Sequence, residues 1–385
     1  MNIMLLGKYP PIQGGESRKA YWLSKYLGSR GHKICVVSNC LEVEENYKCI
    51  LTEEDKDMLQ PKNVTLKSTY PVRLPKFIPQ NNPFSEKLTS IALDAAEEFK
   101  PDLIFSWYLL PYAVAGFNLS KILGKKHLIH HAGSDITRLF HYPYLNSFLS
   151  EVIKNADGIL TYTPSKKFFE KLRVKKTFIN LNAFPPEFNP NDSNANLQNK
   201  LGVEINNKSL LFLGKLSKQK GIEYLIDSFS EIGINSQLFI AGGGDFKYAI
   251  EYKISNGNLN NVYLLGNLPT WKIPSLIRSV HAVVVPEYNF GVSAHRSGIP
   301  FESLLCGRTP LISTQIALKY GQLSDFFVKI NPIDKSGLTR ILEEILENEA
   351  LNNKIIEENN NIKKLIGDFD DYINNFESIF NELVS

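Results

Sequence analysis

Two lysines on one short loop are the residues of this chain best suited to chemistry on a phosphate. Lys215 and Lys220 follow the apolar run 210–213 and Gly214, and a helical pattern begins directly after them. Because both lie in a tight loop before a helix start, their ammonium groups can converge on one anion. The alternative is that both lysines are solvated, as is common on a loop.

A second candidate is the helix start within the stretch 283–313. An apolar strand pattern is followed by a polar loop, a helix predicted to start near Ser297, and another strand pattern. In an open α/β sheet such a loop lies at the carboxyl ends of the strands, where ligands bind. Backbone N–H groups near Gly298 and the positive end of the helix dipole favour a phosphate. Glu302, in the first turn, either complements that dipole or contacts the ligand.

The first half of the chain opens with a pattern typical of a βαβ unit. An apolar run at 3–7 is followed by a loop with Gly14 and Gly15, an amphipathic helix, and a second apolar run at 34–38. The glycine pair would let a ligand approach the backbone closely, although a plain turn has the same composition. His131 follows a later predicted strand and is either a hydrogen-bonded structural residue or a contact to substrate.

Apolar runs and helical patterns alternate through both halves and predict an α/β protein with two domains. The 385 residues are enough for two buried cores. The stretch 189–201 is rich in Asn and Asp and poor in apolar residues, so we predict a linker there. The predicted domains are residues 1–188 and 202–366, followed by a C-terminal helix within 367–385.

Composition excludes several classes of function. A net charge of +3 is too small to indicate nucleic-acid binding. The four cysteines lack the spacing of a zinc site or a disulfide framework. The first apolar segment, residues 1–7, is too short for a signal peptide, and no apolar run approaches the ~20 residues that span a bilayer. We therefore expect a cytoplasmic protein, whose basic helix ending at Lys176 is a solvated face or, alternatively, a weak peripheral contact with the inner membrane face.

Two further motifs carry no cofactor. The run Gly242-Gly-Gly-Asp fails the dinucleotide fingerprint because a lysine stands at 247, where a glycine is required. The acidic pair Asp368-Phe-Asp begins a helix, and N-capping explains it without a metal ion. We expect no metal site and no bound cofactor.

Several of these segments resemble family 4 glycosyltransferases, which have the GT-B fold. The resemblance covers the donor-site segment starting at Phe301, the diphosphate clamp Gly-Lys-x-x-x-x-Lys-Gly at 214–221, and the opening loop Pro-Pro-x-x-Gly-Gly at 10–15. The turn starting at His131 is similar to the family's active-site His-Gly-x-Asp, and residues 182–190 are similar to its interdomain segment.

The resemblance implies two doubly wound Rossmann-like domains facing each other across a cleft, with the C-terminal helix returning to the first domain. It implies retaining transfer of a sugar from a nucleoside-diphosphate sugar to a glycan, lipid-linked or small-molecule acceptor. The residues it implies are, for catalysis, His131, Lys215 and Lys220, and, for the donor, Gly14, Gly15, Gly214, Gly243, Gly298 and, at the ribose hydroxyls, Glu302.

The sequence departs from the family pattern at the first of two glutamates, whose position is Ala294. Since alanine offers no acceptor to a sugar hydroxyl, we expect His295 or Arg296 to contact the donor sugar, unless both face solvent. Glu287 lies too far upstream to match without a rearranged loop. The departure leaves a second hypothesis open, a non-catalytic GT-B subunit that binds a nucleotide sugar or a partner enzyme.

Overall fold

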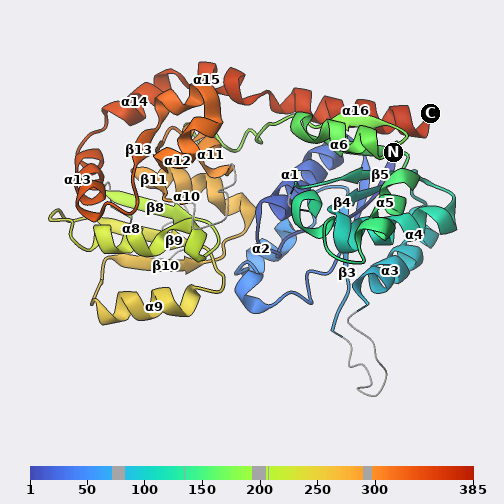
Figure 1. Cartoon of the computed structure of the whole chain (residues 1–385), viewed down its shortest axis with the longest axis horizontal. Coiled ribbons are helices and arrows are strands. Elements are labelled where there is room, and N and C mark those ends of the chain that lie inside the picture. Colours follow the sequence, from blue (N-terminus) through green and yellow to red (C-terminus); the bar gives the residue numbers. More distant parts are fainter. Residues whose placement is uncertain (72–82, 134, 193–204, 207, 289–296) are drawn as a thin grey trace. The chain divides into compact units, whose positions relative to one another are not determined.

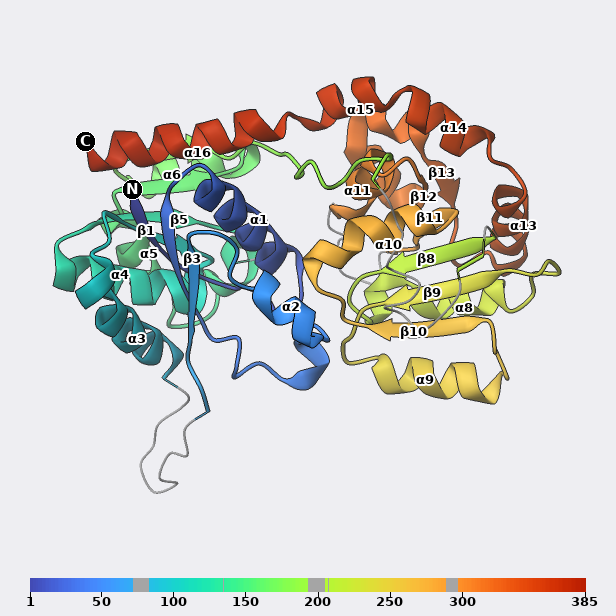
Figure 2. The same ribbon diagram turned by 180° about the vertical axis from the view of Figure 1, so that it is seen from behind.

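The computed structural model describes residues 1–71, 83–133, 135–192, 205–206, 208–288 and 297–385. The chain forms two compact units, which Figures 1 and 2 show from opposite sides. Unit 1 consists of Met1–Asn182 and Phe369–Ser385, and unit 2 of Ala183–Asp368. Most of the predicted linker, 189–201, falls outside the described residues. The boundary between the units, at Asn182 and Ala183, lies upstream of this linker. It lies there because Phe188 is buried in the core of unit 2 and Arg278 donates to the carbonyl oxygens of Glu187 and Asn189 at 2.9 and 3.1 Å.

The described part of unit 1 contains a parallel sheet in the order β3-β2-β1-β4-β5-β6-β7. Its strands are β1 (Asn2–Gly7), β2 (Lys33–Ser38), β3 (Val64–Ser68), β4 (Leu103–Trp107), β5 (Lys126–His130), β6 (Gly158–Thr161) and β7 (Thr177–Ile179). Its main helices are α1 (Gly15–Ser29), α2 (Glu53–Met58), α3 (Phe84–Phe99), α4 (Val114–Leu123), α5 (Asn146–Asn155) and α6 (Lys166–Lys171).

The C-terminal helix α16 (Phe369–Val384) also belongs to unit 1. Its apolar face buries Phe376 and Phe380 against Phe105 of β4, with ring centroids 5.9 and 5.6 Å apart. At its edge Glu377 pairs with Arg30 at 2.9 Å. The last 17 residues are therefore part of the core of unit 1, although they follow unit 2 in the sequence.

The described part of unit 2 contains a second parallel sheet, in the order β10-β9-β8-β11-β12-β13. Its strands are β8 (Ser209–Leu213), β9 (Gln237–Ala241), β10 (Val262–Gly266), β11 (Ala282–Val285), β12 (Thr309–Ser313) and β13 (Val328–Ile330). Its helices include α8 (Ile222–Phe229), α9 (Lys247–Asn256), α10 (Ile273–Ser279), α11 (Ile299–Leu305), α12 (Thr314–Ala317), α13 (Lys335–Leu346), α14 (Ala350–Glu357) and α15 (Asn359–Ile366).

Helices cover both faces of each sheet, as the nearly uninterrupted apolar strands require. In β8, for example, Leu211 faces one core layer while Leu210 and Phe212 face the other. The prediction of two doubly wound α/β domains is confirmed. The strand order reverses between β1 and β4 in unit 1 and between β8 and β11 in unit 2. Ligands of such sheets bind at the carboxyl ends of the strands beside these switch points.

Candidate functional site

The loop after β8 is joined by backbone hydrogen bonds to the loop after β9. The N–H of Gly214 donates to the carbonyl oxygen of Ala241 at 3.0 Å, and the N–H of Leu216 donates to that of Gly243 at 2.9 Å. A side chain at Gly242 would overlap the Gly214 carbonyl group. The predicted glycines 214 and 243 therefore lie together, at the carboxyl edge of the sheet.

Each predicted lysine is paired with its own carboxylate. Lys215 Nζ lies 3.4 Å from Asp245 Oδ2, and both side chains are well exposed, at 43% and 70%. Lys220 Nζ forms an ion pair with Glu287 Oε1, where the lysine side chain is 29% exposed and the glutamate only 6%. Asp245 follows β9 and Glu287 follows β11, so the two partners lie on opposite sides of β8. In the chain without a ligand each lysine thus lies against a separate carboxylate, and the convergence of the two lysines on one anion stays a prediction.

The Lys220 pair spans the switch point of unit 2. Next to it, the N–H of Tyr288 donates to the carbonyl oxygen of Gln219 at 3.2 Å, and a side chain at Gly221 would overlap the carbonyl group of Pro286. These contacts hold the lysine loop against the end of β11. The sequence alone could not reveal the pair, because it depends on β11 being the neighbour of β8.

The predicted helix start near Gly298 is present as the N-terminal end of α11. The Tyr320 hydroxyl accepts from the Ser297 N–H and donates to the Ser297 carbonyl oxygen, both at 2.9 Å. Glu302 is fully buried in this helix. Burial raises the pKa of the nearby Cys306 thiol to about 12, and the charge of Glu302 adds to that rise, so this cysteine is a poor nucleophile.

Ala294, His295 and Arg296 lie outside the described residues, and their proposed role at the donor sugar stays a prediction.

In unit 1 the predicted glycine pair borders open space. Gly14 has φ of +120°, and a Cβ built on Gly14 or Gly15 meets nothing within 4 Å in the described structure. The first turn of α1 has no side-chain cap. A larger side chain would fill this space at the start of α1, where an approaching anion would lie.

A network missed by the sequence analysis lies beside this glycine pair. Glu16 accepts a hydrogen bond from the buried indole of Trp107 at 2.6 Å and pairs with Lys19 at 3.3 Å. Lys19 Nζ also donates to the Tyr162 hydroxyl at 3.4 Å. Burial opposes the charge of Lys19, but Glu16 and Tyr162 outweigh it and raise the pKa of the ammonium. Glu16 thus connects the start of α1 to the end of β4 across the switch point of unit 1.

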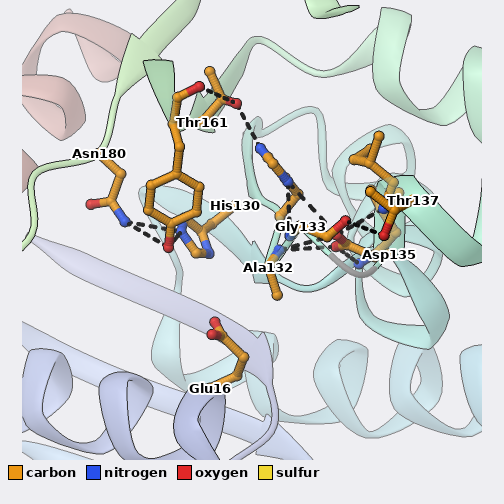
Figure 3. A network of polar contacts seen from close by, with 12 residues as sticks. Glu16, His130, Ala132, Gly133, Asp135, Thr137, Thr161 and Asn180 are labelled. Atoms are coloured by element: carbon orange, nitrogen blue, oxygen red, sulfur yellow. Dashed lines mark hydrogen bonds and ion pairs between the residues drawn. The ribbon is translucent and has the colours of Figure 1, made fainter. Parts of the chain in front are cut away.

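The turn around Gly133 and Asp135 is internally hydrogen-bonded (Figure 3). His131 Nδ1 accepts from the Gly133 N–H at 3.1 Å, and His131 Nε2 lies 2.6 Å from Thr161 Oγ1. The side chain is fully buried. These contacts fit a residue that positions the turn, and a direct contact of His131 with sugar or acceptor remains a prediction.

The neighbouring His130 is also buried. Its Nε2 accepts from Asn180 Nδ2 at 3.0 Å, and burial, with the charges of His131 and Lys19, lowers the pKa of His130 well below its usual range. Burial likewise lowers the pKa of Lys8, which Glu16 and Asp135 only partly oppose.

Among the described residues, no group of three or more His, Cys, Asp or Glu side chains is arranged to hold a metal ion. None of the described helices has the length and apolar character needed to cross a bilayer.

Comparisons with known proteins agree with this geometry. Residues 193–362, within unit 2, match the family model described as "Glycosyl transferases group 1". The chain is 25% identical over 354 residues to an uncharacterized glycosyltransferase of Methanocaldococcus jannaschii, covering 81% of this chain and 80% of that protein. It is 22% identical over 319 residues to the N-acetyl-alpha-D-glucosaminyl L-malate synthase of Bacillus anthracis, covering 80% and 77%.

Solved structures extend the similarity to the whole chain. Sucrose-phosphate synthase from Thermosynechococcus elongatus superposes with a TM-score of 0.70 at 15% identity, covering 100% of this chain and 99% of that one. HepE of Anabaena, in complex with UDP and glucose, gives a TM-score of 0.69 at 17% identity and 100% coverage of both chains. The family model thus matches the part of the chain within unit 2, and the solved structures show that the whole chain has the GT-B fold.

Proposed function

We propose that the chain is a retaining family 4 glycosyltransferase that moves a sugar from a nucleoside-diphosphate sugar to a glycan, lipid-linked or small-molecule acceptor. The observation that carries the proposal is the lysine loop of unit 2. It places two partly exposed ammonium groups and closely packed glycine backbone at the carboxyl edge of the sheet. The resemblance of this loop to the family's diphosphate clamp and the UDP bound to HepE support the same ligand class.

The chemistry follows from where charge develops. As the bond between sugar and diphosphate breaks, negative charge grows on the leaving diphosphate, and fixed cations and N–H groups aimed at it lower the barrier. We assign this task to Lys215, Lys220 and the N–H groups near Gly298. That Gly14 and Gly15 contact the donor stays a prediction. Lysines in this role would serve as the counter-charge, and we therefore propose a metal-independent reaction without a resident cofactor.

The acceptor is assigned to unit 1, as the family resemblance implies. The basic segment ending at Lys176 favours a solvated face over contact with lipid, because several of its lysines have acidic partners. Lys166 lies 3.8 Å from Glu170 and Lys176 lies 3.1 Å from Glu382. A cytoplasmic protein with at most weak peripheral contact is the proposal that fits these pairs.

One observation favours the alternative of a non-catalytic subunit. Both clamp lysines already have a carboxylate partner in the ligand-free chain, as they would if their role were structural. The exposed fractions of the two side chains, 43% and 29%, still allow them to reach an anion.

The two hypotheses are separated by incubating the full-length protein with UDP-, GDP- and ADP-sugars and measuring release of the nucleoside diphosphate. An enzyme releases one nucleotide well above the rate of a Lys215→Ala/Lys220→Ala double variant, and NMR of the product's anomeric proton then tests retention. Nucleotide binding without any release or transfer, across donors and candidate acceptors, would instead support the non-catalytic subunit.

A further inference from the structure

A buried carboxylate holds the cation that the proposed reaction needs. Glu287 is only 4% exposed, yet it directly follows β11 at the edge of the sheet where ligands of this fold bind. Its partner Lys220 follows the neighbouring strand β8. The pair therefore connects the two central strands of unit 2 at their carboxyl ends.

The backbone at Glu287 is fixed by bonds from two directions. The Ser313 hydroxyl, at the end of β12, donates to the Glu287 carbonyl oxygen at 2.5 Å. The next residue, Tyr288, donates its N–H to Gln219 in the lysine loop at 3.2 Å. The backbone that carries the carboxylate is thus held by the sheet and by the lysine loop.

The physical consequence concerns the freedom of Lys220. A lysine has a flexible four-carbon stem and three N–H donors on its ammonium group. A buried carboxylate is destabilising unless a cation pairs with it, so Glu287 favours the few rotamers that keep the ammonium at this position. One donor then points to Glu287, while the exposed part of the ammonium can meet a ligand. A charge fixed in advance stabilises a developing anion better than one that must be ordered during the reaction.

The other clamp lysine provides the contrast. Lys215 and Asp245 are 3.4 Å apart and both largely exposed, and such pairs restrict a side chain little because water competes for both charges. Asp245 is therefore a matched control for Glu287: the same charge, paired with the other lysine of the same loop, without burial.

We propose that Glu287 is a positioning residue of the donor site, which acts on the reaction through Lys220 by holding its ammonium group toward the donor diphosphate. This inference rests on the proposed function. Glu287 is the carboxylate that lies too far upstream to match the first glutamate of the family pattern. The role proposed here requires no contact between Glu287 and the sugar.

The test is a double-mutant cycle on the full-length protein with Glu287→Gln, Lys220→Met and the double variant. The control cycle uses Asp245→Asn, Lys215→Met and their double variant. We measure kcat and KM with the donor identified in the nucleotide-sugar panel, and UDP or GDP affinity by calorimetry. Glu287→Gln is expected to lower kcat by about tenfold in the wild-type background and by less than about twofold in the Lys220→Met background, because contacting residues are not additive. Asp245→Asn is expected to change kcat by less than about twofold, as an exposed pair should.

Glu287→Asp, which keeps the charge, should recover part of the loss. Equal effects of Glu287→Gln in both backgrounds, or an unchanged kcat, would overturn the proposal. Tighter nucleotide binding with an unchanged kcat would show that Glu287 only competes for Lys220.

If thermal unfolding shows that Glu287→Gln alone does not fold, the neutral double variant is compared with Lys220→Met, and any further loss of kcat counts against the proposal. Failure of the wild-type protein to bind or turn over any nucleotide sugar would contradict the proposed function as well, whereas an additive cycle in an active enzyme contradicts the role of Glu287 alone.

Discussion

The two sheets each have a glutamate that bridges the two central strands at the switch point, but its partner differs. In unit 1, Glu16 accepts from the buried indole of Trp107 at the end of β4. In unit 2, Glu287 pairs with Lys220, a partly exposed cation on the loop after β8. The first arrangement uses the acid to fix a neutral aromatic core, and the second uses it to fix a charge at the surface.

The residues around the two bridges extend this difference. Beside Glu16, the side chains of His130 and His131 are fully buried and hydrogen-bonded, and α16 packs Phe376 against Trp107 with ring centroids 6.3 Å apart. Beside Glu287, the neighbouring loops meet through glycine backbone and leave two ammonium groups partly exposed. Unit 1 therefore presents a buried, hydrogen-bonded polar scaffold, and unit 2 presents partly exposed positive charge suited to an anion.

Removing either clamp lysine should have the largest effect on function. We expect Lys215→Ala and Lys220→Ala each to lower transfer by about two to three orders of magnitude, as loss of one preorganised charge does. The two should differ in stability, because Lys220→Ala leaves the buried Glu287 without its cation and costs about 2 kcal/mol, whereas Lys215→Ala exposes only a solvated acid. Steady-state kinetics and urea unfolding of both variants measure the two effects. Near wild-type turnover of either variant with saturating donor would contradict the clamp.

A smaller effect is expected when the bridge of unit 1 is broken. Trp107→Phe keeps most of the aromatic packing but removes the indole N–H that donates to Glu16. We expect a loss of about 1–3 kcal/mol in the free energy of unfolding and no more than about a tenfold loss in kcat. Glu16→Gln can still accept from the indole but loses the ion pair with Lys19, so it tests the charge of Glu16 separately from the hydrogen bond. Stability is followed by urea unfolding and kcat by donor turnover. A loss of transfer as large as that of the lysine variants would place Glu16 among the groups that contact substrate.

The sequence predicted the elements of both sites better than their pairings. The apolar run 210–213 corresponds closely to β8, Ser209–Leu213, because an uninterrupted apolar segment is typical of a strand buried on both faces. The pairing of Lys220 with Glu287 joins residues on strands that become neighbours only through the crossover order of the sheet. In the same way, the burial of His131 depends on Phe169, whose ring centroid lies 4.9 Å away and which no motif connects to it. Periodicity reports which face of an element is buried, but not which elements meet.

The buried histidines should make unit 1 sensitive to mild acid. Burial lowers the pKa of His127 to about 3, below the value of about 6.5 for an unfolded chain. The unfolded state therefore binds the proton first as the pH falls. The free energy of unfolding is unaffected by this histidine above about pH 6.5 and decreases progressively toward pH 3, by up to about 1.4 kcal/mol per pH unit. Hydrogen exchange of β5 peptides at pH 5 and 7.5 should show this loss after correction for intrinsic exchange rates. A His127→Gln variant should show a weaker pH dependence, and an equal dependence in both proteins would contradict the assignment.

The smallest effect expected is that of a chelator. Lys215 and Lys220 are proposed as the counter-charge of the diphosphate, so they already supply the positive charge that a hard cation would. The rate of transfer should therefore stay within about twofold of its initial value after incubation with EDTA and after addition of magnesium or manganese. The measurement is the initial rate with saturating donor, and the matched control is the Lys220→Met variant. If unit 2 binds the diphosphate through lysine alone, added magnesium should restore little of the activity that this variant has lost. Full loss of wild-type activity with EDTA, restored by either cation, would contradict the metal-independent reaction. It would show that the charge of Lys220, held by Glu287, does not neutralise the diphosphate without a metal ion.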